Sequence, residues 1–137
     1  MFQLLEHPSD IGILSRAATR EEALIEASKG LVSILVNPEN FRPKEERYFK
    51  ATGTDHAAQV VNWLNEIIFF FDTEGMVFVE FAIDSWSPDE IAGRAVGERF
   101  DIDRHEFRTA VKATTYHQFE SHPTAEGGWE LRVFVDV

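Results

Sequence analysis

The end of the chain carries two carboxylates on neighbouring residues. The sequence stops at Asp136-Val137, directly after an alternating apolar segment and without a polar tail. The side chain of Asp136 and the α-carboxylate of Val137 are hard, acceptor-only oxygen ligands, which suit Ca²⁺, Mg²⁺ or Mn²⁺. Two such groups repel each other unless a cation or a hydrogen-bond donor lies between them. The pattern therefore indicates a cation site, and the alternative is a frayed chain end that binds nothing.

A second candidate for oxygen ligation lies in residues 7–10, which read His-Pro-Ser-Asp. Pro8 restricts the backbone, and His7 and Asp10 flank a break between two apolar segments. If the first and last strands are neighbours, an exposed Asp10 joins Asp136 in one oxygen-rich site. The alternative is an ordinary turn in which the Asp10 carboxylate bonds its own backbone.

Two further histidines are candidates with plain structural alternatives. His117 falls among the apolar residues of a predicted strand, which favours a hydrogen-bonded core histidine over a ligand. His105 lies beside Asp101 and Asp103, so this group either binds a metal or forms a solvated acidic loop. The sequence contains no HExxH, CxxC, GxSxG or P-loop motif, and nothing near Ser9 orients it as a nucleophile.

The elements that position these residues follow from the hydrophobic pattern. Apolar residues at three- and four-residue spacing predict two helices. One follows the predicted N-cap Thr19, and the other runs from His56 to Glu74 before Gly75. Apolar or alternating segments predict seven strands, at residues 2–7, 11–17, 47–52, 77–83, 90–98, 107–119 and 129–136.

The resulting order of elements is ββαβαββββ, in a single domain that spans residues 1–137. Short turns join the strands that follow the second helix, which favours antiparallel pairing. We therefore expect an α+β fold, with a mostly antiparallel sheet and both main helices packed on one face of it.

Length and composition limit the classes of function. The chain has 137 residues, of which 44% are hydrophobic and 27% charged, as is typical of one globular domain. The absence of cysteine excludes a disulfide framework, a thiolate zinc site and a cysteine nucleophile. No apolar run reaches the ~18–20 residues that span a bilayer, and the first residues lack the basic region of a secretory signal. We therefore expect a cytoplasmic protein.

The charge balance indicates the kind of partner. There are 24 acidic and 13 basic residues, which leaves a formal charge of −11. Such a surface repels a phosphate backbone, so strong direct binding of nucleic acid is not expected. It favours cations and basic protein partners.

Taken together, several short segments resemble the archease family. They occur in the order typical of that family and span nearly the whole chain. The matching segments are 7–12 (HPSDIG), 62–66 (NWLNE), 73–75 (TEG), 97–98 (GE), 105–106 (HE), 111–117 (VKATTYH) and 136–137 (DV).

The resemblance implies a small cytosolic protein that assists the RtcB-type RNA ligase of tRNA splicing and RNA repair. Such a protein promotes guanylation of the ligase and its multiple turnover, without catalysis of its own. The resemblance also implies a divalent cation, Ca²⁺, Mg²⁺ or Mn²⁺, on Asp10, Asp136 and Val137. Candidates for supporting these ligands or contacting the partner are His7, His105, Lys112 and His117.

Two other functions remain open. A metal-dependent phosphate-ester hydrolase or phosphotransferase would use Asp10, Asp136, His117 and His7, although no base–nucleophile pair is evident in the sequence. A chaperone-like protein-binding domain would use an exposed part of the 12 phenylalanines.

Overall fold

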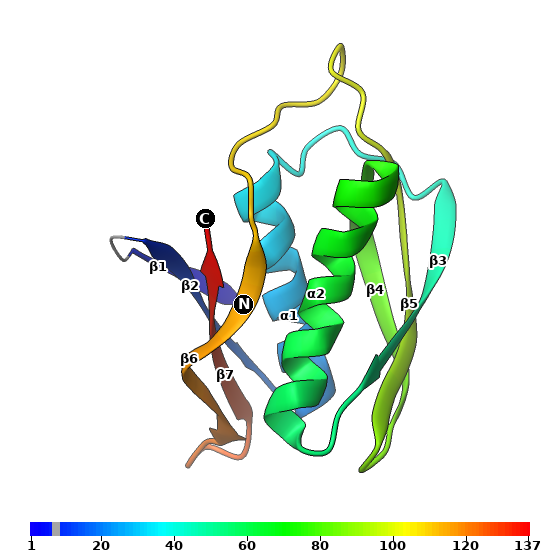
Figure 1. The fold of residues 1–137 in the computed structure, drawn as a ribbon. Coiled ribbons are helices and arrows are strands. Elements are labelled where there is room, and N and C mark those ends of the chain that lie inside the picture. Colours follow the sequence, from blue (N-terminus) through cyan, green and yellow to red (C-terminus); the bar gives the residue numbers. More distant parts are fainter. Residues whose placement is uncertain (7–8) are drawn as a thin grey trace.

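The computed structural model describes residues 1–6 and 9–137 and contains nine elements in the predicted order ββαβαββββ (Figure 1). The paired strands all run antiparallel, so the predicted α+β class is confirmed. The elements are β1 (Phe2–Glu6), β2 (Asp10–Ala17), α1 (Arg20–Leu35), β3 (Glu45–Thr52), α2 (His56–Glu74), β4 (Met76–Trp86), β5 (Glu90–Arg99), β6 (Ala113–Pro123) and β7 (Trp129–Asp136).

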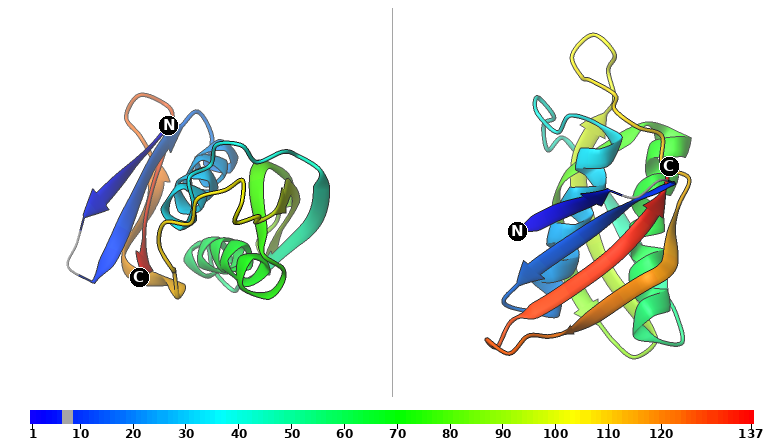
Figure 2. Two further views of the ribbon diagram at one scale, coloured as in Figure 1. Left: turned by 90° about the horizontal axis from the view of Figure 1, so that it is seen from above. Right: turned by 90° about the vertical axis from the view of Figure 1, so that its left-hand side faces the viewer.

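The strands form two sheets rather than one continuous sheet. One sheet has the order β1-β2-β7-β6 and the other the order β3-β5-β4. Figure 2 shows from above that α1 and α2 lie between the two sheets. Both helices therefore cover one face of each sheet, and the division of the strands is a feature that the sequence pattern did not reveal.

The composition of α2 explains this three-layer arrangement. A helix that is apolar around most of its circumference has to be covered by more than one neighbour. Trp63 illustrates the point: its ring lies 5.0 Å from the ring of Phe49 in β3, and its Nε1 donates to Ser28 Oγ of α1 at 3.0 Å. The buried residues of α2 are Gln59, Val60, Val61, Trp63, Leu64, Ile67 and Ile68.

Local signals set the helix ends as predicted. The Thr19 side chain accepts a hydrogen bond from the Glu22 N–H, and the Asp55 side chain accepts one from the Ala58 N–H. Gly75 ends α2 in the left-handed conformation, with φ of 68°, which a residue without a Cβ adopts easily. Neither helix in the described part of the chain is both long and apolar enough to cross a membrane.

The predicted strand over 107–119 is wrong in its first half, because β6 begins only at Ala113. Phe107 instead forms an isolated bridge with Val36, directly after α1. Its ring also stacks on that of Phe71 in α2, with 6.2 Å between the ring centroids. These contacts tie the segment to the ends of both helices, and they hold it as a loop outside the sheet.

The second half is confirmed as a strand, but β6 is irregular. The register with β7 shifts between Thr115 and Glu120, and Gln118 has φ of 49°. The predicted single apolar face through His117 is therefore broken. His117 is exposed and is not a core histidine.

Candidate functional site

Asp10 and Asp136 face each other across the β2–β7 pair. The antiparallel register makes them direct partners at the point where β2 begins and β7 ends. Directly opposite residues of an antiparallel pair project to the same face, with Cβ atoms about 4.5–5.5 Å apart. The fold thus brings together the two aspartates that the sequence analysis selected from opposite ends of the chain.

The two aspartates differ in accessibility. Asp10 is only 7% exposed, so the expectation of an exposed Asp10 is wrong. Phe134, which is itself buried, lies diagonally opposite Asp10 on the same face, within the reach of an aromatic side chain. Asp136 is exposed, and Val137 is 37% exposed. Asp10 is therefore the buried member of the pair, whereas Asp136 and the neighbouring Val137 are accessible to solvent.

An apolar wall adjoins the pair on the same face. Gly12 is the cross-strand partner of Phe134, whose side chain is buried. A Cβ at Gly12 would lie 2.9 Å from the Phe134 ring and 3.0 Å from Leu5 Cβ. The glycine therefore leaves space for the ring, which forms an apolar border on the face that carries the two carboxylates. A low local dielectric strengthens the electrostatic interactions of such groups.

Lys112 and His117 both lie near the aspartate pair, Lys112 through its backbone and His117 through its ring. The Lys112 N–H donates to the Asp136 carbonyl at 2.9 Å, which places Lys112 beside the end of β7. The His117 ring lies 5.8 Å from the ring of Phe134, the residue of the apolar wall. Another predicted candidate, His7, lies outside the described residues.

His105 contacts a different part of the protein. Its ring stacks on Phe41 with 3.6 Å between centroids, and its Nδ1 accepts a hydrogen bond from the Asp101 N–H at 2.9 Å. Since Nδ1 accepts, the proton lies on Nε2, which donates to Asn40 O at 2.9 Å and lies 3.1 Å from Glu98 Oε1. The His105 ring therefore connects its own loop with the loop that contains Asn40 and Phe41.

The donor set at the aspartate pair is compatible with a divalent cation. Among the residues that the structure describes, no three His, Asp or Glu side chains form a group that could hold a metal ion. A cation at the pair would thus take two carboxylates, with further oxygens from the end of the chain and from water. Carboxylate and water oxygens are the donors that Ca²⁺ and Mg²⁺ prefer. Among the described residues, His105, Asp101 and Asp103 likewise do not form a group that could hold a metal ion.

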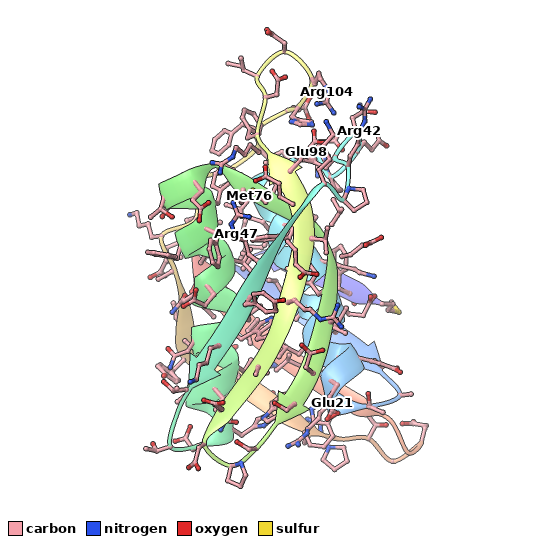
Figure 3. The ribbon with its side chains drawn as sticks, turned by 90° about the vertical axis from the view of Figure 1, so that its right-hand side faces the viewer. Glu21, Arg42, Arg47, Met76, Glu98 and Arg104 are labelled. Atoms are coloured by element: carbon pink, nitrogen blue, oxygen red, sulfur yellow. The ribbon has the colours of Figure 1, made fainter. Side chains whose placement is uncertain are left out.

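Glu98 is a buried charge whose role the sequence did not indicate. It is 4% exposed at the end of β5, its Oε1 lies 2.8 Å from Arg104 Nη2, and its Oε2 accepts a hydrogen bond from the Arg42 N–H at 3.2 Å. Burial by itself raises the pKa of Glu98, but the hydrogen bond and charge of Arg104, the hydrogen bond from the Arg42 N–H and the charge of Lys44 together hold that pKa below its usual value. Figure 3 shows Arg42 and Arg104 next to Glu98 at this end of the molecule.

A histidine–serine pair lies near the other end of β7. Ser121 Oγ is 2.5 Å from His56 Nε2 and accepts a hydrogen bond from Trp129 Nε1 at 2.9 Å. Burial, and to a lesser extent the charge of Arg20, lower the pKa of His56. Among the described residues, none is hydrogen-bonded to His56 Nδ1, so the pair lacks the third group that typically activates a nucleophilic serine.

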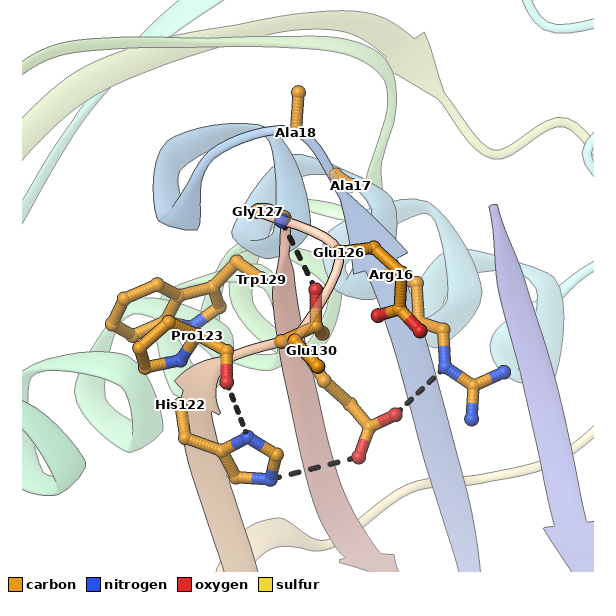
Figure 4. A pocket seen from close by; sticks show the side chains of 12 residues that line it. Arg16, Ala17, Ala18, His122, Pro123, Glu126, Gly127, Trp129 and Glu130 are labelled. Atoms are coloured by element: carbon orange, nitrogen blue, oxygen red, sulfur yellow. Dashed lines mark hydrogen bonds and ion pairs between the residues drawn. The ribbon is translucent and has the colours of Figure 1, made fainter.

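A hollow of about 860 Å³ lies beside the turn between β6 and β7 (Figure 4). Glu130 lies in its wall, where one carboxylate oxygen is 2.7 Å from Arg16 Nε and the other is 3.6 Å from His122 Nε2. The hollow adjoins the Ala17–Trp129 end of the strand pair, whereas the two aspartates lie at the opposite end. It therefore does not belong to the candidate cation site.

The fold and the aspartate pair define a small two-sheet α+β protein whose paired strand ends carry carboxylates. The sequence matches the model of the Archease protein family (MTH1598/TM1083) over residues 2–137. The chain therefore belongs to the archease family, as the resemblance of its short segments predicted.

Individual relatives agree with this assignment. Protein archease of Methanosarcina mazei is 32% identical over 140 residues, which cover 99% of this chain and 95% of that protein. Protein archease of Methanopyrus kandleri is 35% identical over 136 residues, which cover 97% and 96%. The solution structure of Methanobacterium thermoautotrophicum protein 1598 is similar with a TM-score of 0.82 and 28% identity, covering 99% of this chain and 98% of that one. An archease of Thermotoga maritima shares the fold, with a TM-score of 0.61 and 17% identity over 100% of this chain and 98% of that one.

Proposed function

We propose that this protein is a non-catalytic, cytoplasmic accessory protein of an RtcB-type RNA ligase in tRNA splicing and RNA repair. Its action would be to promote guanylation of the ligase and multiple turnover. The observation that carries the proposal is the register of β2 and β7, which sets Asp10 directly opposite Asp136. Membership of the archease family supports it.

In this proposal Asp10, Asp136 and the carboxylate of Val137 hold a divalent cation, Ca²⁺, Mg²⁺ or Mn²⁺. Like charges directly opposite each other in a sheet are destabilising, and a cation between them reverses that cost. When bound, such a cation supplies a Lewis acid that can engage phosphate oxygens. The chain contributes a fixed carboxylate in Asp10 and an apolar wall at Gly12 and Phe134 on the same face.

The proposed partner is a protein rather than a nucleic acid. The chain has a formal charge of −11, so its surface repels the phosphate backbone of free RNA. A ligase that binds RNA needs a basic surface around its substrate groove, and an acidic accessory protein docks on such a surface by charge complementarity. His117 and Lys112, which lie near the aspartate pair, are the residues that we expect closest to that contact.

The proposal is tested by measuring guanylation and turnover of the RtcB-type ligase of the same organism, with and without this protein. We expect the wild-type chain to accelerate both, and Asp136→Asn to accelerate them less. Asp89→Asn is the matched control, because Asp89 is an exposed aspartate in the turn before β5. A ligase that is equally active with and without the wild-type chain would contradict the proposal.

A chaperone-like role is the second candidate, because the Thermotoga maritima archease is described as a possible chaperone. It predicts that the chain reduces aggregation of unrelated unfolded proteins, which an activator specific for one ligase does not do. The hydrolase alternative predicts turnover of generic phosphate esters by the protein alone with Mn²⁺ or Mg²⁺. These two assays separate the three functions.

A further inference from the structure

Ile102 is a large apolar side chain placed at the tip of a turn. It is 83% exposed, more than any other large hydrophobic residue in the described part of the chain. The Arg104 N–H donates to Asp101 O at 3.0 Å, so Ile102 and Asp103 are the central residues of a β-turn. Such positions favour Gly, Pro, Asn, Asp or Ser, and isoleucine contributes nothing to the turn itself.

The turn that carries Ile102 is held by several hydrogen bonds. Asp101 O also accepts from the His105 N–H at 2.8 Å. Asp101 Oδ1 accepts from the Asp103 N–H at 3.0 Å, and the Asp101 N–H donates to His105 Nδ1 at 2.9 Å. The position of Ile102 is therefore fixed before any partner binds, which reduces the entropy that binding costs.

The buried charge of Glu98 anchors this turn to the sheet. Its carboxylate pairs with Arg104, the last residue of the turn, and also lies 3.1 Å from Nε2 of His105, the next residue. A buried charge is costly, and apolar residues often stabilise a core better, so such a pair is better explained by the geometry that it imposes. Here that geometry is the position of residues 101–104, which rise above the ends of both helices (Figure 1).

We infer that Ile102 is an anchor residue that inserts into an apolar pocket bordered by lysine or arginine side chains on a protein partner. The acidic side chains of Asp101 and Asp103 flank Ile102 and match a basic border. Two arginines also line the hollow beside Ile102, but Arg99 is paired with Glu45 and Arg104 with Glu98. The inference rests on the proposed function in one respect, since it takes the partner to be the RNA ligase. A second copy of this chain fits less well, because it carries the same charge of −11.

The test is the dissociation constant of the complex between labelled full-length protein and the purified ligase. We expect Ile102→Asp to raise it at least about tenfold, as loss of a central apolar anchor does. Ile102→Val, which keeps an apolar side chain, changes it less than about threefold. Tyr48→Asp is the matched control, because Tyr48 is also a largely exposed apolar side chain (76%) but lies in β3. The Ile102 side chain is exposed, so the variants fold, and circular dichroism verifies this.

The outcomes separate the two proposals. If the wild-type chain binds the ligase and Ile102→Asp binds equally well, the anchor is overturned and the proposed function stands. If the wild-type chain does not bind the ligase, both are overturned. If size-exclusion chromatography with light scattering shows a wild-type dimer that Ile102→Asp converts to a monomer, the pocket belongs to a second copy and the inference about the ligase is wrong.

Discussion

Asp10 and Asp136 are direct cross-strand partners although 125 residues lie between them in the sequence. Asp10 is nearly buried and Asp136 is exposed. Two carboxylates in this relationship repel each other, and the repulsion is strongest where water is excluded. A divalent cation bound between the two carboxylates, as proposed above, would offset that repulsion.

The first prediction follows from this repulsion. Asp136→Asn removes one of the two charges, so without divalent cations the variant is more stable than the wild type, by about 0.2–1 kcal/mol. With Ca²⁺, Mg²⁺ or Mn²⁺ the order reverses, because only the wild type gains free energy from binding the ion. Thermal unfolding with chelator and with each cation measures both effects.

The control for that measurement is Asp89→Asn, which removes an equal charge at an exposed position. We expect the same shift of Tm by each cation as in the wild type. If Asp136→Asn and Asp89→Asn respond to the cations equally, the aspartate pair is not a cation site.

The second prediction concerns the apolar wall. Gly12→Ala places a Cβ within 2.9–3.0 Å of the Phe134 ring and of Leu5. The ring has to shift, and overpacking of this kind costs about 1–3 kcal/mol of unfolding free energy. Urea denaturation measures the loss, and Ala18→Gly at an exposed site provides a comparison. A variant as stable as the wild type would show that the ring has room to move.

The third prediction concerns pH. Burial lowers the pKa of His56 in the folded protein, while in the unfolded chain the imidazole has its ordinary pKa of about 6.5. As the pH falls through that value, the unfolded chain takes up a proton that the folded chain does not, so His56 makes the protein less stable in acid. Above that range the residue has no such effect.

His56→Phe tests this linkage, because phenylalanine keeps an aromatic ring against Trp86 and does not titrate. We expect the difference in unfolding free energy between wild type and variant to change in favour of the variant between about pH 7.5 and pH 5. Urea denaturation across that range gives the difference. A constant difference would mean that the pKa of His56 is the same in both states.

The sequence predicted those features that depend on local signals. The bounds of α2 follow from the cap Asp55 and from Gly75, which act within one turn of the helix. The meeting of Asp10 and Asp136 was foreseen only on the condition that their strands pair, because register depends on contacts far apart in the chain. The two-sheet division depends on which strand covers which side of α2, and hydrophobic periodicity within one segment does not determine that.

Local sequence patterns did not predict the cluster around Glu98 or the irregularity of β6 either. His105 lies near Asp101 and Asp103 in sequence, which suggested an acidic loop, but its partners include Phe41 and Asn40 from a separate loop. Glu98 stands in a predicted strand, but its burial could not be read from the sequence because glutamate is usually exposed.

The last prediction concerns the end of the chain. If Val137 supplies its carboxylate, extending the chain with a short tag replaces that carboxylate with a neutral amide and places new residues beside Asp136. Deleting Val137 moves the carboxylate onto Asp136. Both changes should weaken the thermal stabilisation by divalent cations and the activation of the ligase, while the buried Leu131, Val133 and Val135 keep β7 in the sheet. The same tag placed before Met1 is the control, and circular dichroism verifies folding. A frayed end instead tolerates extension, so full cation response and full ligase activation by both altered chains would remove Val137 from the site.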